Sequence, residues 1–145
     1  MSKVSRSALV SHSPQQMFAL VSEIESYPTF LPWCDRARVS ERTGNRTVAT
    51  LRINFRGLKE EFTTENRDRP GERIDMKLVS GPFRSLEGSW RFIPLSDKAC
   101  KVELNLSYEF ASRLLDRVVG AVFDGIANSL VDAFARQADR RFGSS

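Results

Sequence analysis

The sequence predicts a single α+β domain in which a curved antiparallel sheet wraps around a long C-terminal helix. Apolar and polar residues alternate through residues 36–110, a pattern typical of strands with one buried face. Short turns separate the alternating runs, so consecutive strands are expected to pair as a meander. After Phe110 the apolar period changes to 3.6, which indicates one helix to about Arg140. A chain of 145 residues suits one domain over 1–145, with a core spanning about 3–140.

The N-terminal segment is expected to contain a strand, a helix and a loop. Residues 3–11 read as a strand that stops at Ser13, whose side chain can cap a helix that begins at Pro14. Pro28 and Pro32 follow closely, and two prolines prevent a long regular element. A short helical turn followed by a loop is therefore expected there.

The central strands are defined by their alternation and by the turns between them. Ala49, Leu51 and Ile53 alternate with polar residues, which predicts one buried and one wet face. Glycine, proline, asparagine and aspartate mark the expected turns between antiparallel neighbours. These turns are Thr43-Gly44-Asn45, Arg56-Gly57-Leu58, Arg69-Pro70-Gly71, Ser80-Gly81-Pro82 and Ser96-Asp97-Lys98.

The long helix is expected to begin after the N-cap Ser112 and to lie in the concave face of the sheet, a helix-grip arrangement. Its apolar stripe is predicted to comprise Leu115, Val118, Val119, Val122, Ile126, Leu130 and Ala133. Gly120 and Gly125 each cost a helix about 1 kcal/mol relative to alanine. Close approach of a strand and space for a ligand are equally good reasons for them.

The composition offers few groups for catalysis. His12 is the sole histidine and is expected to be solvated, while Cys34 and Cys100 lack the spacing of a zinc or redox pair and are expected to be buried thiols. Glu60 and Glu61 are adjacent strand residues that point to opposite faces, so they cannot share a proton-transfer site. No metal site, no required cofactor and no enzymatic activity are expected.

Charge and hydropathy limit the kinds of partner that the chain can bind. The 22 Lys and Arg residues exceed the 18 Asp and Glu residues, giving a mildly basic net charge of +4. No run approaches the roughly 18 uninterrupted apolar residues of a spanning helix. No secretory segment is apparent at the start. The chain is expected to be cytoplasmic, with any membrane contact peripheral and at the inner membrane face.

A helix laid across a half-open sheet leaves an elongated apolar pocket, which predicts binding of a hydrophobic small molecule. Trp33 and Phe30 lie in a proline-bounded loop that can form a lid or a membrane-dipping tip, although core packing is the commoner fate of these and the other aromatic residues. The candidate ligand-binding residues are Tyr27, Phe30, Leu31, Pro32, Trp33, Phe83, Trp90, Val122, Phe123 and Ile126.

Three motifs carry a family resemblance: SYPTFLPWC at 26–34, SGPFRSLEGSWRF at 80–92 and VFDGIANSLVDAF at 122–134. Together they resemble the coenzyme Q-binding START-like proteins of the polyketide cyclase/dehydrase superfamily, and most closely the branch of bacterial ribosome-association toxins. The resemblance extends from Ser5 to Ala138.

This resemblance implies a helix-grip fold and a tunnel for ubiquinone or a related isoprenoid lipid, in support of respiratory electron transport. The toxin branch implies instead binding to the large ribosomal subunit and a block of subunit joining, with an antitoxin partner as an open question. Non-enzymatic lipid binding is the favoured hypothesis and the ribosomal toxin is the alternative. A polyketide cyclase/dehydrase-like enzyme is the weakest of the three.

Overall fold

The structure, a computed structural model, describes residues 2–55 and 57–143. Its strands form a seven-stranded antiparallel sheet of order β1-β7-β6-β5-β4-β3-β2 within this described part. The strands are β1 (Ser2–Val10), β2 (Cys34–Thr43), β3 (Arg46–Phe55), β4 (Leu58–Arg69), β5 (Arg73–Ser80), β6 (Phe83–Ser96) and β7 (Ala99–Phe110). The helices are α1 (Pro14–Ser22), the short 3-10 helix η1 (Ile24–Thr29) and α2 (Arg113–Phe142).

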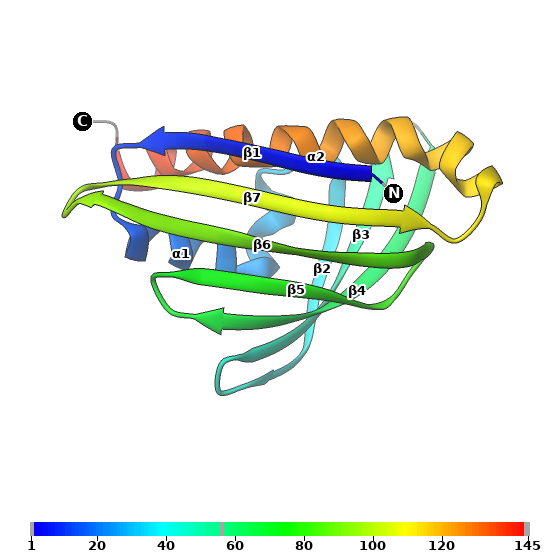
Figure 1. The fold of residues 1–145 in the computed structure, drawn as a ribbon, viewed down its shortest axis with the longest axis horizontal. Coiled ribbons are helices and arrows are strands. Elements are labelled where there is room, and N and C mark those ends of the chain that lie inside the picture. Colours follow the sequence, from blue (N-terminus) through cyan, green and yellow to red (C-terminus); the bar gives the residue numbers. More distant parts are fainter. Residues whose placement is uncertain (1, 56, 144–145) are drawn as a thin grey trace.

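The sheet is the predicted meander, bent around the long helix. Strands β2 to β7 pair in sequence order, and β1 returns to pair with β7. Figure 1 shows β2, β3 and β4 running at a steep angle to β6 and β7, so the sheet curves, with α2 lying along its concave side. The α+β helix-grip prediction is confirmed. Each expected turn joins two strands, and Arg56 in one of them lies outside the described residues.

The predicted helix caps are both present. The Ser13 hydroxyl accepts a hydrogen bond from the Gln16 backbone N–H at 3.1 Å, and the Gln16 side chain accepts one from the Ser13 N–H at 3.0 Å. This reciprocal pair satisfies two of the donors that a helix start leaves free. The Ser112 hydroxyl likewise accepts from the Leu115 N–H at 3.2 Å.

The buried face of α2 differs from the predicted stripe. It comprises Val119, Gly120, Phe123, Ile126, Ala127, Val131, Phe134 and Ala138. Val118 is 56% exposed, so its placement in the stripe was wrong, and Leu115 and Val122 are only half-buried. The N-terminal end of α2 extends past the ends of the strands (Figure 1). Leu114 and Val118 in this part of the helix are 68% and 56% exposed.

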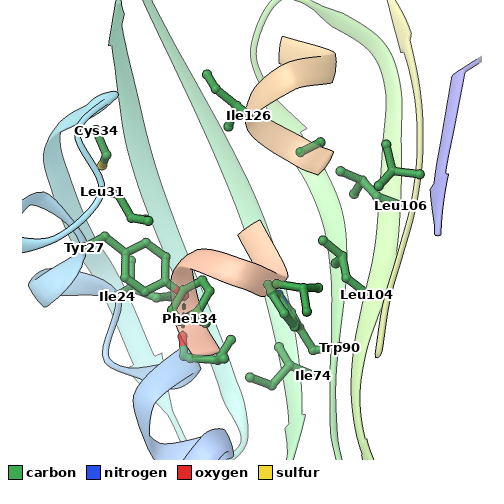
Figure 2. Packing of buried hydrophobic residues seen from close by; sticks show 14 of the residues in the cluster. Ile24, Tyr27, Leu31, Cys34, Ile74, Trp90, Leu104, Leu106, Ile126 and Phe134 are labelled. Carbon is green, nitrogen blue, oxygen red and sulfur yellow. Dashed lines mark hydrogen bonds between the residues drawn. The ribbon is translucent and has the colours of Figure 1, made fainter. Parts of the chain in front are cut away.

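Aromatic rings fill the space between α2 and the sheet. Phe134 packs edge-on against Tyr27, Phe30 and Trp90, with ring centroids 5.2–5.3 Å apart. Figure 2 shows Phe134 between Tyr27 on one side and Trp90 on the other. Although α2 is long and apolar enough to cross a membrane by length and composition, this packing is that of a core helix.

Two glycines give opposite predictions for stability. A Cβ at Gly88 would lie 2.4 Å from the Asn105 backbone oxygen, so Gly88→Ala must push β6 from β7 and should cost about 1–3 kcal/mol. A Cβ at Gly125 meets no atom within 4 Å, so Gly125→Ala should stabilise α2 by about 1 kcal/mol. Urea denaturation of the wild-type protein and the two variants measures both changes in the free energy of unfolding. Equal effects of the two substitutions would contradict this account.

The two cysteines are predicted to be unreactive in the folded chain. Cys34 and Cys100 are free and buried, as expected, and burial raises the pKa of each thiol to about 11. Because the thiolate is the reactive form, the native protein at pH 8 should react with Ellman's reagent far more slowly than the urea-unfolded protein. Rapid labelling of both thiols in the native protein would show that they are not enclosed.

Candidate functional site

An apolar cavity of about 80 Å³ lies between α2 and the concave face of the sheet. Side chains from η1, the following loop, strands β3 to β7 and α2 form its wall. They are Ile24, Tyr27, Trp33, Ala49, Leu51, Phe62, Thr64, Asn66, Met76, Leu86, Trp90, Leu104, Leu106, Phe123, Ile126, Ala127, Leu130 and Phe134. On α2 these residues run from Phe123 to Phe134, so the cavity occupies the middle of the helix–sheet contact.

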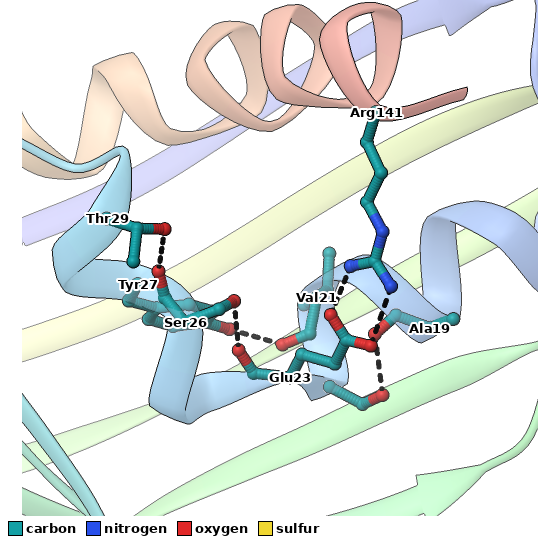
Figure 3. Close-up of polar contacts among 8 residues, drawn as sticks. Ala19, Val21, Glu23, Ser26, Tyr27, Thr29 and Arg141 are labelled. Atoms are coloured by element: carbon teal, nitrogen blue, oxygen red, sulfur yellow. Dashed lines mark hydrogen bonds and ion pairs between the residues drawn. The ribbon is translucent and has the colours of Figure 1, made fainter. Parts of the chain in front are cut away.

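The wall carries few polar groups. Tyr27 uses its hydroxyl to donate to the Val21 carbonyl (Figure 3), and burial raises the pKa of this phenol well above its usual range. Thr64 and Asn66 face the cavity from β4, and the Thr64 hydroxyl donates to the Asn66 side-chain oxygen at 2.9 Å. Among the described lining residues none is acidic, basic or a histidine. This wall therefore suits binding and offers no acid–base pair.

A recess of about 20 Å³ adjoins the cavity at its polar end. Asn66, Tyr27 and Trp90 border both spaces, and Asp68 and Thr47 border the recess alone. Partial burial raises the pKa of the Asp68 carboxyl, an effect that the charge of Arg42 partly offsets. The recess thus places the carboxyl of Asp68 just outside the apolar wall.

A larger groove of about 390 Å³ lies on the outer side of the wall. It is lined by Pro32, Trp33, Phe55, Ala121, Val122, Gly125, Ile126 and Ser129. Trp33 and Ile126 line both the groove and the cavity, and they are 7% and 8% exposed. These two side chains form a wall that the two spaces share.

The candidate residues chosen from the sequence separate into three groups. Tyr27, Trp33, Trp90, Phe123 and Ile126 line the cavity. Pro32 and Val122 line the outer groove, together with Trp33 and Ile126.

The remaining candidates, Phe30, Leu31 and Phe83, line neither space. Phe30 packs on Tyr27 and Phe134, Leu31 is buried in the core, and Phe83 stacks on Phe110 at 5.0 Å. Alternation and motifs identify inward-facing residues, but they do not show which of these pack against each other.

The polar lining residues escaped the sequence prediction. Thr64 and Asn66 alternate with exposed or half-buried neighbours and follow the inward-facing Phe62, so the period of two was present. Apolar alternation alone does not identify a polar residue on the inner face.

The prediction that His12 is solvated was wrong. It is 3% exposed and bonded to Asp139 at 2.8 Å.

Comparison with known proteins extends these observations. Residues 10–135 match the family described as polyketide cyclase / dehydrase and lipid transport. The chain is 44% identical over 143 residues to the ribosome association toxin RatA of Vibrio cholerae, covering 99% of each chain. It is 32% identical to the mitochondrial coenzyme Q-binding protein COQ10 homolog B of Xenopus laevis, covering 96% of this chain and 59% of that one.

Solved structures share the architecture. The Zhui aromatase/cyclase from a Streptomyces species superposes with a TM-score of 0.86 at 15% identity, covering 97% of this chain and 95% of that one. This likeness concerns the fold alone. With the family match over most of its length and relatives above 40% identity, the chain belongs to the polyketide cyclase / dehydrase and lipid transport family.

Proposed function

We propose that the protein binds an apolar small molecule of the quinone-bearing isoprenoid class and catalyses no reaction on it. The observation that carries this proposal is the enclosed apolar cavity between α2 and the sheet, whose wall lacks acid–base groups. The identity of the Xenopus relative, a coenzyme Q-binding protein, supports the ligand class. A cyclase- or dehydrase-like enzyme is the weakest candidate, because such chemistry needs groups that this wall does not offer.

The size of the cavity requires a second space for the ligand. A volume of about 80 Å³ is smaller than the several hundred cubic ångströms of usual small-molecule pockets. The outer groove supplies about 390 Å³ on the other side of Trp33 and Ile126. Displacement of the Trp33 side chain would join the two spaces, with the ring of a quinone inside and its isoprenoid tail along the groove.

A quinone titration tests the proposal. Both tryptophans of the chain, Trp33 and Trp90, line the cavity, so a short-chain ubiquinone should quench their fluorescence saturably. Gly125→Phe should place a ring in the groove and raise the Kd by about tenfold, equivalent to about 1.4 kcal/mol. Gly125→Ala, which leaves the groove open, is the matched control.

Two results would contradict quinone binding. One is a titration without saturable quenching, and the other is an organic extract of protein purified from its own host that contains no isoprenoid by mass spectrometry. Equal affinities of the Gly125→Phe and Gly125→Ala proteins would leave binding intact and reject the groove as part of the site.

Ribosome association is the second candidate function. The specific observation in its favour is 44% identity, over 99% of both chains, to a relative named ribosome association toxin. The mildly basic charge of +4 suits contact with the phosphates of ribosomal RNA on the large subunit. An antitoxin partner and peripheral contact with the inner membrane face belong to the same family-based hypothesis. The ribosomal role would place the chain in the cytoplasm, where ribosomes are found.

Sucrose gradients after overexpression in a bacterial host test this second function. Ribosome association predicts fewer joined ribosomes, more free subunits and slower growth. Binding to isolated large subunits should weaken steeply with added salt, because phosphate contacts release counterions. Gly125→Phe should retain the effect if the ribosomal contact is independent of the groove. An unchanged gradient with normal growth would remove this function.

A further inference from the structure

We propose that the side-chain amide of Asn66 is a hydrogen-bond donor to a carbonyl oxygen of the bound ligand, an inference that rests on the apolar-ligand function proposed above. Asn66 lies on β4 and lines the cavity while only 7% of it is exposed. Its neighbour Thr64, on the same inner face, is 8% exposed. The two residues form a small polar patch in a wall that is otherwise apolar or aromatic.

The bond between these residues orients the amide. The Thr64 hydroxyl donates to the Asn66 Oδ1 at 2.9 Å, so Thr64 engages the carbonyl end of the amide. The opposite end, with its two N–H groups, is the end that can donate to another molecule. The amide therefore offers the cavity a donor, and its natural partner is an acceptor such as a carbonyl oxygen.

A buried amide also needs an explanation on energetic grounds. Burying an amide in apolar surroundings is unfavourable unless its hydrogen bonds are made. If the cavity held only hydrocarbon ligands, a leucine of similar size at position 66 would be buried at a lower free-energy cost. An asparagine at this position gains when the ligand itself carries an acceptor, which separates quinones from plain isoprenoid hydrocarbons.

The position of Asn66 agrees with the direction of the ligand. Asn66 lines the small recess together with Thr47 and Asp68, whereas a separate set of residues lines the outer groove. The recess and the groove have no lining residue in common, so they adjoin different parts of the cavity wall. The oxygenated ring is thus assigned to the end at Asn66, and the tail to the end at Trp33.

Paired probes and variants test this assignment. The probes are a benzoquinone that bears one isoprene unit and the corresponding benzene that bears the same unit without oxygen. The wild-type protein should bind the quinone about fivefold more tightly, the value of one net hydrogen bond. Asn66→Leu should abolish this preference. Asn66→Asp, which keeps the size but loses the donor, gives the same comparison if the leucine variant fails to fold.

Thr50→Val is the matched control. Thr50 on the neighbouring strand β3 is similarly buried, at 9% exposed, and pairs with the Thr63 hydroxyl at 2.7 Å. It does not line the cavity, so this variant should retain the preference. Full preference in both Asn66 variants would overturn the role of Asn66 while leaving ligand binding in place. Absence of binding of either probe to the wild-type protein would reject the proposed function itself.

Discussion

The structure depends on two aromatic anchors that hold α2 against the concave sheet. Phe134 contacts rings from η1, the following loop and β6, and Phe123 contacts Phe62, Phe83 and Tyr108 with centroids 4.7–6.1 Å apart. Between these anchors the helix presents the small residue Ala127 to the sheet. The rings set the separation of the two layers, and the alanine leaves part of it unfilled. The cavity follows from this combination.

Polar contacts fix the helix along its length. The Tyr108 hydroxyl donates to the Asp124 carboxylate, and Arg6 from β1 donates to Asn128 at 3.0 Å. At the C-terminal end, His12 bonds to Asp139. Arg141 pairs with Glu23 at the same end, and Figure 3 shows this pair. Exposed ion pairs contribute little each, but several contacts in different turns restrain rotation and sliding of α2. These restraints on α2 agree with the proposal that the side chain of Trp33, and not the helix, would move to admit a longer ligand.

The sheet could be predicted from the sequence because period-two alternation and turn residues are local signals. Glycine or proline stands in four of the five expected turns, and both N-cap serines stand directly before their helices. The buried face of α2 could not be predicted as well, because apolar residues such as Val118 surround more of the helix than the sheet covers. Likewise, the sequence does not identify Asn66 as a lining residue, because its burial results from the curvature of the sheet around α2 and not from a local pattern.

Trp33 would couple the interior to the surface if its side chain moves as proposed, because it lines both the cavity and the outer groove. In the proposed arrangement a ligand longer than the cavity would pass Trp33, which also lines the outer groove with Pro32, Val122 and Phe55. Occupation of the cavity would then change the shape of that outer surface, whereas the restrained helix would keep the rest of the fold unchanged. A partner that contacts this surface could distinguish the loaded from the empty protein. The two proposed functions, ligand binding and ribosome association, would then be linked through one residue, because the side chain at position 33 lines both the cavity and the groove.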